Sequence, residues 1–478
     1  MNFGIRKLYI DGALSESSSS ALYDLVCPAN EEVIGQISWA GKEDAERALI
    51  AAEDGFRIWS ELPLKDRLQW IGKLREAILA KSDLLRESIM AEMGKTWEGT
   101  AEDLNSITDS LEYYSNEIQK IQDIPIPDSE GTHEHFIRHQ PLGVVVAFLA
   151  YNFPLLNLGF KLGPALAAGC SIILKPSEFS PLSAYIIGEI CAEIGFPNGV
   201  INVLCGPVSE VGVTLCESRI PALITMIGST GTAQKLIAQS SQTSIKRYSM
   251  ECGGNAPFIV FEDADMDSAV QHAVDLKIGN SGQICVAPNR FYVQEAVVEV
   301  FTERVTTEFK KVSMGFGREQ QPDMGPLANK QSVQRIRSIV QEAIEQGGEL
   351  LVGGWPKEGP GYYFYPTVIL LKDQNAAVLQ KEIFGPVALI VPFSTKEEVC
   401  ILANNTEAGL ASYVYSADES KLVYFAEKLE FGEVHLNGLK FGIYLPHGGI
   451  KNSGIGVDCS PRALDDYLVK KRITRALN

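Results

Sequence analysis

Long apolar stretches are scarce in this 478-residue sequence. The longest, Val144 to Tyr151, is far shorter than the roughly 20 residues that a helix needs to cross a bilayer. The first residues, Met1 to Gly12, carry Arg6 and Lys7 but no apolar segment of signal-peptide length. We therefore expect no membrane partner and a cytoplasmic location.

Basic residues are also fewer than acidic residues. The 42 Lys and Arg residues are outnumbered by 60 Asp and Glu residues, which gives a formal net charge of −18. A surface this acidic repels phosphate backbones and anionic lipid headgroups. The charge balance therefore argues against nucleic acid and membranes as partners.

Paired cysteines and metal-binding histidine clusters are missing as well. The nine Cys are scattered along the chain with no C-x-x-C pair, which is typical of reduced thiols in a cytosolic enzyme and not of a disulfide framework or a zinc site. His133, His135 and His139 are close in sequence, but their alternation fits the polar face of a strand. We therefore predict no metal.

The overall composition, with 45% hydrophobic and 21% charged residues, is that of a globular protein. A chain of this length exceeds what one small core holds, so two or three domains are expected. The ranges 41–60 and 64–94 are predicted as amphipathic helices. In the second range, Ile71, Leu74 and Ile78 recur at helical spacing.

Short strands alternate with helices in the middle of the chain, after a hairpin signal from 122 to 140. This alternation predicts an α/β fold with a parallel, doubly wound sheet, which binds ligands beyond the carboxyl ends of its strands. After residue 285 a second α/β unit is predicted, followed by a strand-like segment. The predicted strands are Val144–Leu149, Ser171–Leu174, Val200–Leu204, Leu223–Ile227, Ala256–Phe261 and the last segment Asp466–Ala476; the predicted helices are Leu158–Ala168, Pro181–Ile194, Glu210–Glu217, Thr232–Gln239, 295–312 and 331–347.

Three of the predicted strands are followed by loops rich in functional groups. Tyr151-Asn-Phe-Pro154 follows the first, Lys175-Pro-Ser-Glu178 the second and Gly228-Ser-Thr-Gly231 the fourth. A Gly/Ser turn at a helix N-terminus offers free N–H groups to a phosphate, and a carboxylate at a strand end, here Glu178, accepts hydrogen bonds from a ribose. Each motif alone is weak, since there is no G-x-G-x-x-G. Together they predict one ligand-binding edge.

One cysteine follows a tight turn. A helix-like run from Ala269 to Ile278 gives way to Asn280-Ser-Gly-Gln-Ile-Cys285, and a loop on a rigid scaffold is a common place for a nucleophile. A free Cys is more often a small buried hydrophobe, so Cys285 alone does not establish catalysis. Glu251 precedes Gly253-Gly254 and either caps that turn or carries a carboxylate into a cleft.

Seven motifs, in order, resemble those of the NAD(P)-dependent aldehyde dehydrogenases over nearly the whole chain. Glu251 also lies 34 positions before Cys285 (285 − 251) and 99 after Asn152 (251 − 152), as in that family. The resemblance implies a Rossmann-type cofactor domain, a second α/β catalytic domain and a small β oligomerisation arm. The motifs are Tyr151-Asn-Phe-Pro154, Lys175-Pro-Ser-Glu178, Gly228-Ser-Thr230, Glu251-Cys-Gly-Gly-Asn255, Asn280-Ser-Gly-Gln-Ile-Cys285, Glu382-Ile-Phe-Gly-Pro386 and Pro446-His-Gly-Gly-Ile-Lys451.

The resemblance implies a role for each matching residue. Cys285 is similar to the family's nucleophile, Asn152 to its oxyanion donor and Glu251 to the general base that activates water to hydrolyse the thioester. Lys161 and Asp458 match proton-relay positions. The positions that match cofactor contacts are Lys175, Ser177, Glu178, Gly228, Ser229, Cys252, Glu382 and Phe384. Because the Glu178 carboxylate would repel a 2′-phosphate, NAD is the predicted cofactor, with NADP as the alternative.

The positions that match the substrate pocket depart from the usual family pattern. Tyr151 and His447 replace a common Trp and a frequent Phe, which predicts a more polar pocket. Succinate-semialdehyde enzymes of the family bind the distal carboxylate with arginines, whereas Phe160 and Gly279 at the matching positions cannot pair with an anion. We therefore expect a neutral or hydroxylated aldehyde. The matching pocket positions are Tyr151, Phe153, Phe160, Ile284 and His447.

Three other functions stay open at this point: a succinate-semialdehyde dehydrogenase, a CoA-acylating aldehyde dehydrogenase, and a non-catalytic binding protein on the same fold. A CoA-acylating enzyme needs no water-activating base, so Glu251 argues against it.

By family analogy, residues 1–121 and 142–253 form the dinucleotide-binding domain and 254–453 the catalytic domain. Residues 122–141 and 454–478 then form the arm. Exposed edge strands invite self-association, so a homodimer or homotetramer is expected.

Overall fold

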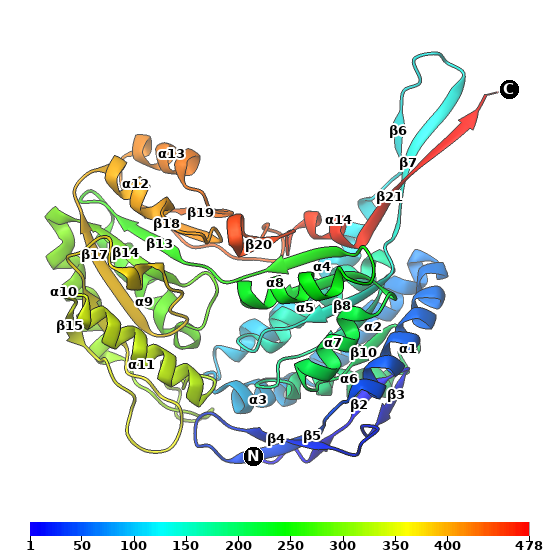
Figure 1. The fold of residues 1–478 in the computed structure, drawn as a ribbon, viewed down its shortest axis with the longest axis horizontal. Helices are drawn as coiled ribbons and strands as arrows, with labels where there is room; N and C mark the ends of the chain where they lie inside the picture. Colours follow the sequence, from blue (N-terminus) through cyan, green and yellow to red (C-terminus); the bar gives the residue numbers. More distant parts are fainter. Residues whose placement is uncertain (478) are drawn as a thin grey trace.

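The computed structural model describes residues 1–477 and forms two α/β lobes with a projecting arm (Figure 1). One lobe contains an eight-stranded sheet with the strand order β20-β12-β11-β8-β9-β10-β2-β3. The other contains a seven-stranded sheet with the order β15-β16-β17-β14-β13-β18-β19. Both sheets are mostly parallel and carry helices between consecutive strands, so the predicted α/β fold class is confirmed.

Five parallel strands form the middle of the eight-stranded sheet. Every residue of β8 and β9 is buried, which explains why these segments read as unbroken apolar runs. The strands are β8 (Val144–Phe148), β9 (Ser171–Lys175), β10 (Ile201–Val203), β11 (Pro221–Ile227) and β12 (Arg247–Glu251), and the helices between them are α5 (Pro154–Ala168), α6 (Leu182–Ile194), α7 (Val213–Glu217) and α8 (Thr230–Ser240).

Strand β12 is absent from the sequence prediction. It pairs with β11 over five residues, but it is short, and its polar residues Arg247, Ser249 and Glu251 make it unlike the unbroken apolar run of β8. The predicted strand Ala256–Phe261 exists as β13 (Ala256–Val260), but it belongs to the other sheet. The chain therefore passes from one lobe to the other directly after Glu251.

The helical lead-in covers the eight-stranded sheet. It consists of α1 (Lys42–Glu61), α2 (Leu64–Ala80), α3 (Ser82–Met93) and α4 (Thr100–Glu117). The prediction of one helix over 64–94 is wrong, because Lys81 leaves the helical region (φ −109°, ψ 22°) and separates α2 from α3.

Helix α4, which the sequence did not predict, packs closely against α5. A Cβ at Gly159 would lie 2.7 Å from Ile107 Cα, so the glycine permits the close approach of the two helices.

The second lobe repeats the strand–helix pattern. The predicted helices near 295–312 and 331–347 are confirmed as α10 and α11. Strand β15 is antiparallel to β16, and the other neighbouring strands are parallel. The strands are β13, β14 (Pro288–Gln294), β15 (Glu349–Val352), β16 (Thr367–Leu370), β17 (Val387–Phe393), β18 (Ala411–Tyr415) and β19 (Glu433–Leu436); the helices are α9 (Met266–Ile278), α10 (Val298–Lys311), α11 (Lys330–Glu345), α12 (Lys396–Asn404) and α13 (Glu419–Lys428).

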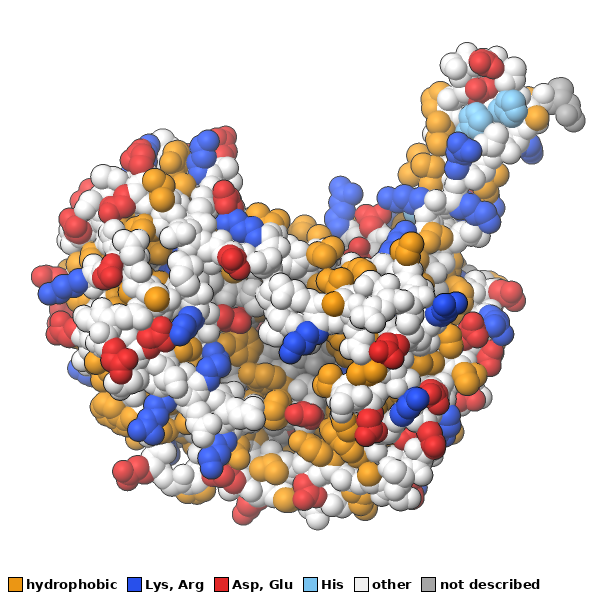
Figure 2. All heavy atoms as spheres, in the orientation of Figure 1, with side chains coloured by type: hydrophobic (Ala, Val, Ile, Leu, Met, Phe, Trp, Pro, Cys, Tyr) orange, Lys and Arg blue, Asp and Glu red, His pale blue; other side chains and the backbone are white. Residues whose placement is uncertain are grey.

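The arm is a three-stranded antiparallel sheet that extends away from both lobes (Figures 1 and 2). Strands β6 (Ile124–Ile126) and β7 (His133–Pro141) form the predicted hairpin, and β21 (Leu468–Ala476) pairs with β7 over nine residues. Strand β20 (Gly454–Ile455), which was assigned to the arm, instead pairs with β12 in the eight-stranded sheet. The domain boundaries themselves stay a prediction.

The remaining elements lie at the edges of the lobes. Strands β2 (Leu8–Ile10) and β3 (Ala13–Ser15) extend the eight-stranded sheet, and a separate three-stranded sheet contains β1 (Ile5–Arg6), β4 (Leu22–Val26) and β5 (Val33–Ser38). The short helix α14 (Leu464–Tyr467) leads into β21. Among the described residues, no helix is long and apolar enough to span a membrane.

Candidate active site

Cys285 lies just beyond a strained turn at the end of α9. Asn280, Ser281 and Gly282 all adopt left-handed backbone conformations, with φ of 46°, 56° and 69°. Two consecutive non-glycine residues in this region are uncommon and are held by the surrounding structure. The Asn280 side chain donates to the Asn152 carbonyl at 2.8 Å, and Ser281 Oγ donates to the Gly325 carbonyl at 2.8 Å. The turn therefore fixes the position of the thiol.

Asn152 lies beside this turn, as the sequence predicts. Its side chain is buried, its Nδ2 donates to the Gln283 carbonyl at 3.0 Å, and its Oδ1 accepts from Asn157 Nδ2 at 3.3 Å. An amide nitrogen carries two N–H groups, so one stays free for an oxyanion. Asn152 and Cys285 line the same cavity. Their arrangement suits stabilisation of negative charge next to the sulfur.

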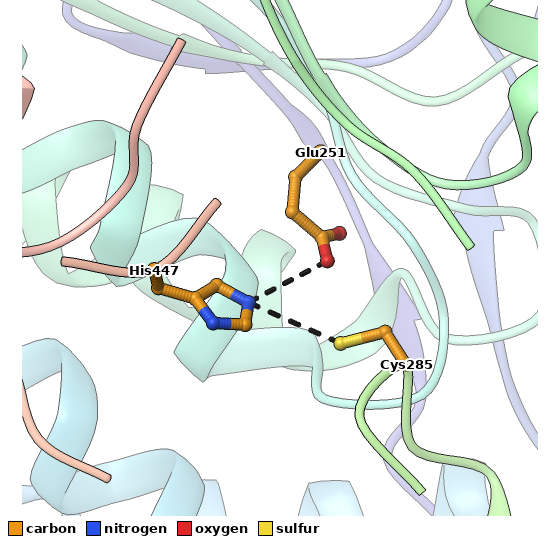
Figure 3. Close-up of side chains that lie close together, drawn as sticks. All are labelled: Glu251, Cys285 and His447. Atoms are coloured by element: carbon orange, nitrogen blue, oxygen red, sulfur yellow. Dashed lines mark hydrogen bonds and ion pairs between the residues drawn. The ribbon is translucent and has the colours of Figure 1, made fainter. Parts of the chain in front are cut away.

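Glu251 is the last residue of β12, and its carbonyl accepts from the Gly228 N–H at 3.0 Å. The side chain is 4% exposed, and one of its oxygens lies 3.5 Å from His447 Nε2. Glu251, Cys285 and His447 each place one atom that could bind a metal ion, and these three atoms all lie within 4.8 Å of one another (Figure 3). The prediction of no metal stays open, because this spacing would also admit an ion.

One ring nitrogen of His447 faces both the thiol of Cys285 and the carboxylate of Glu251 (Figure 3). Its Nε2 is 4.0 Å from Cys285 Sγ, and its Nδ1 is 2.6 Å from Glu433 Oε1 on β19. The sequence predicts His447 as a pocket residue only, and it gives no sign of Glu433. Contact between a strand residue and a loop 14 positions later leaves no pattern in the sequence.

The groups around Cys285 shift the pKa of its thiol in opposite directions. Burial and the Glu251 carboxylate raise the pKa of the Cys285 thiol to about 12, against the hydrogen bond from His447. Burial lowers the pKa of His447, but its hydrogen bonds to Cys285, Glu251 and Glu433 outweigh burial and raise that pKa well above its usual value. Burial works against ionisation of Glu433, yet its bonds to His435 and His447 lower its pKa to about 2. These contacts favour a neutral thiol beside a protonated imidazole ring.

A cavity of about 660 Å³ leads to Cys285. Of the predicted pocket residues, Phe153, Phe160, Ile284 and His447 line it. Tyr151 is not among these residues, and its ring packs against Phe179 and Phe384, so its place in the substrate pocket stays a prediction. Of the two residues predicted to make the pocket polar, His447 lines the cavity.

The cavity wall is acidic. Besides Glu251 and Glu433 it includes Glu102 and Asp109 of α4 and Asp275 of α9, whereas Lys440 is its one Lys or Arg among the described residues. Phe160 and Gly279 also line it.

Polar groups that can bind a hydroxyl are present in the same wall. They include the side chains of Asn105, Ser106 and Asn157. The cavity thus combines negative charge with neutral hydrogen-bonding groups.

Lys161 and Asp458, the predicted relay pair, form a buried ion pair. Lys161 Nζ lies 2.6 Å from both oxygens of Asp458. Asp458 also forms a backbone bridge with His447, with N···O distances of 2.8 and 2.7 Å. The structure therefore brings this pair next to the segment that carries His447.

The residues predicted to bind the cofactor surround the carboxyl ends of β9, β11 and β12. Ser229 caps the N-terminus of α8, which is exposed together with its first turn. Glu382 accepts from the Gly254 N–H at 3.2 Å, and burial raises its pKa to about 7. A Cβ at Gly253 would overlap the Glu382 carboxylate.

The second group of cofactor residues follows β9 and the 382–386 loop. Lys175 is buried at the end of β9, and Ser177 and Glu178 follow it with partial exposure. Cys252 is buried and donates its N–H to the Ser453 carbonyl at 2.9 Å, whereas Phe384 has a left-handed backbone (φ 49°). An open helix N-terminus and a half-buried carboxylate beside a glycine suit a dinucleotide.

Comparison with known proteins agrees with this geometry. A model of the aldehyde dehydrogenase family matches residues 14–473. Glutarate-semialdehyde dehydrogenase of Pseudomonas aeruginosa is 35% identical over 97% of this chain and 96% of its own. D-glyceraldehyde dehydrogenase (NADP(+)) of Thermoplasma acidophilum is 36% identical over 98% of this chain and 95% of its own.

A solved structure matches equally well. Betaine aldehyde dehydrogenase of Staphylococcus aureus, in complex with NAD+, superposes with a TM-score of 0.96 at 33% identity, covering 99% of this chain and 95% of the other. The chain therefore belongs to the aldehyde dehydrogenase family and is an NAD(P)-dependent aldehyde dehydrogenase.

Proposed function

We propose that this enzyme oxidises a small, uncharged, hydroxylated aldehyde to the carboxylic acid, with NAD as the preferred cofactor. The observation that carries the substrate assignment is the acidic cavity wall, which includes Phe160 and Gly279, the positions that the family resemblance links to anion-binding arginines. Carboxylates repel an anionic substrate, whereas Asn105, Ser106 and Asn157 offer hydrogen bonds to hydroxyl groups.

In the first half of the reaction, Cys285 attacks the aldehyde carbon. The carbon–sulfur bond forms as the carbonyl π electrons move to oxygen, and the Asn152 amide with the Cys285 N–H stabilises the resulting oxyanion. The bound nicotinamide supplies the hydride acceptor. Residues of this chain hold the aldehyde so that its hydrogen faces that acceptor while sulfur stays attached to carbon.

In the second half, water cleaves the thioester. Glu251 removes a proton from the attacking water, and the thiol leaves as the acid is released. Lys161 and Asp458 carry the proton from the Glu251 side of the site, in line with their buried ion pair. A buried carboxylate beside the sulfur favours hydrolysis over transfer to CoA.

The cofactor assignment rests on the residues after β9 and β11. Lys175, Ser177 and Glu178 bind the adenosine ribose, and the α8 N-terminus with Gly228 and Ser229 binds the pyrophosphate.

The nicotinamide half is held separately. Glu382, with Phe384 and the Cys252 backbone, holds the nicotinamide ribose. A carboxylate at 178 repels a 2′-phosphate, which favours NAD.

A second candidate is oxidation of a semialdehyde that carries a distal carboxylate. Two observations favour it: the identity to glutarate-semialdehyde dehydrogenase, and Lys440 in the cavity wall as a cation for that carboxylate. Lys440 is exposed and shares the wall with carboxylates, so we rank this candidate second.

The deciding experiment compares kcat/KM for glyceraldehyde, lactaldehyde, succinate semialdehyde, glutarate semialdehyde and betaine aldehyde with NAD. We expect hydroxylated aldehydes to exceed the semialdehydes by about tenfold or more, since an unpaired buried anion loses a charged hydrogen bond. Semialdehyde preference that disappears in Lys440→Met would establish the second candidate. Preference for betaine aldehyde would replace the hydroxylated assignment with a cationic one.

The arm is the proposed subunit contact of a homodimer or homotetramer. Ile124 and Ile126 on its edge strand are 49% and 38% exposed, and Figure 2 shows the arm standing clear of the body. Apolar side chains on an exposed edge strand favour pairing with another copy. The nine cysteines are all free, which favours the reducing cytoplasm as the compartment.

A further inference from the structure

The imidazole of His447 occupies a position that neither the oxyanion site nor the water-activating base explains. Its Nε2 is 4.0 Å from Cys285 Sγ and 3.5 Å from a Glu251 oxygen, and its Nδ1 is 2.6 Å from Glu433 (Figure 3). We infer that His447, held as an imidazolium by Glu433, is a further catalytic residue that stabilises the Cys285 thiolate. This inference rests on the proposed role of Cys285 as the nucleophile.

The imidazole ring is fixed from three sides. The hydrogen bond between Nδ1 and Glu433 sets the orientation of the ring. The backbone bridge to Asp458 fixes the position of the loop that carries His447. The ring also packs on Phe160, at a centroid distance of 6.1 Å. A ring held in this way presents Nε2 to the thiol without a change of rotamer. Preorganisation of charge, and not contact alone, is what makes such a group effective in catalysis.

The groups that face the imidazole set its charge. Glu433 approaches from β19, Glu251 from β12 and Cys285 from the turn after α9. Cys459, which lines the same cavity, is the fourth titratable group near the ring. Two carboxylates against one imidazole favour the protonated ring.

Cys285 needs such a cation more than an ordinary thiol does. The cavity wall carries several carboxylates, and the nearest of them, Glu251, disfavours negative charge on sulfur, as does burial. The imidazolium is the cationic group next to the sulfur, and it offsets this repulsion where the charge develops. The Cys285 thiol can therefore ionise and attack the aldehyde even though the pocket is acidic.

The proton balance of the step is simple. The S–H proton moves to a Glu251 carboxylate oxygen, and the sulfur lone pair forms the bond to the aldehyde carbon. The imidazolium keeps both of its protons and compensates the charge on sulfur until the bond has formed. Glu251 then releases its proton to solvent before it activates water.

Alkylation by iodoacetamide measures the thiolate directly, without aldehyde or cofactor. The other eight cysteines are buried, so Cys285 is the expected target, and Cys285→Ala gives the background rate. The full-length enzyme is assayed with a chelator from about pH 6 to 10, beside His447→Phe and His447→Gln. Because an opposite charge at this distance shifts a pKa by about 1–3 units, both variants should alkylate about 10- to 1,000-fold more slowly at neutral pH.

Variants of Glu433 test whether this residue acts indirectly, by holding the His447 ring in its protonated form. Glu433→Gln keeps the size and one acceptor but removes the charge, so the imidazole should lose its proton at lower pH. The alkylation rate should then fall on the alkaline side of the profile, and Glu433→Asp should restore part of it. Profiles that are the same in Glu433→Gln and the parent would show that Glu433 does not hold the charge of the ring.

Two results would overturn the inference. One is an unchanged alkylation profile in His447→Phe, with NAD affinity and melting temperature at parental values so that misfolding is excluded. The other is a normal burst of NADH in His447→Phe with slow turnover afterwards, which would place His447 in thioester hydrolysis. Because alkylation uses no aldehyde, an error in the proposed substrate leaves the outcome of this test unchanged.

Discussion

The two walls that meet at Cys285 are built in different ways. The cofactor wall consists of short continuous motifs, most of which follow a strand, such as Gly228-Ser-Thr230 after β11. The substrate wall is assembled from α4, α5, β19 and the 440–447 segment, which are far apart in the sequence. The residues for the common chemistry of the family can therefore be recognised in short sequence motifs. The residues that select the aldehyde come together only in the folded chain.

The largest effect is expected where the two walls join. Asn152→Ala removes an oxyanion donor that serves any aldehyde, so kcat should fall by about 10²–10³ for every substrate with little change in the KM for NAD. Steady-state assays on two unlike aldehydes would measure this. A loss confined to one aldehyde would place Asn152 in the substrate wall instead.

The next effect belongs to the substrate wall alone. Phe160→Arg adds a cation at a position that the sequence links to anion binding, so kcat/KM for succinate semialdehyde should rise by about 10- to 100-fold relative to an uncharged aldehyde. Phe160→Met is the matched control, since it changes shape without charge. Equal ratios in the two variants would mean that the distal end of the substrate does not reach this position.

The cofactor wall should respond without any change in aldehyde preference. Glu178→Gln removes the charge that faces a 2′-phosphate, so the NADP to NAD ratio of kcat/KM should increase by about tenfold. The order of preferred aldehydes should stay the same. A changed order would show that the two walls are coupled.

The smallest expected effect is one of pH. Burial raises the pKa of Glu382 to about 7, so its carboxyl becomes protonated as the pH falls through 7 and loses acceptor capacity for a ribose hydroxyl. The KM for NAD should therefore rise several-fold below neutral pH, by at most about tenfold per pH unit. In Glu382→Gln the KM should be high and independent of pH, and a parental pH dependence in that variant would assign the titration to another group.

The sequence predicted the parts of the site that local pattern controls. Asn152, Glu251 and Cys285 were predicted through short continuous motifs. Only the motif of Cys285 contains a left-handed turn, at Asn280, Ser281 and Gly282. Strand β12 was missed because it is only five residues long and, with Arg247 and Ser249, lacks the unbroken apolar run of β8. The packing of Tyr151 against Phe384 and the contact of Glu433 with His447 were not predicted, since both depend on side-chain packing between distant segments.

The left-handed turn before Cys285 has a consequence for how variants of this enzyme should be interpreted. Neither Ser281 nor Gly282 lines the large cavity, yet a β-branched residue at 281 or any side chain at 282 would be strained at φ values of 56° and 69°. At 282 a Cβ would in addition overlap the Gly385 carbonyl. Substitutions at either position would displace Cys285 Sγ from the substrate carbon. Activity would then be lost although Asn152, Glu251 and the other contacting groups are unchanged.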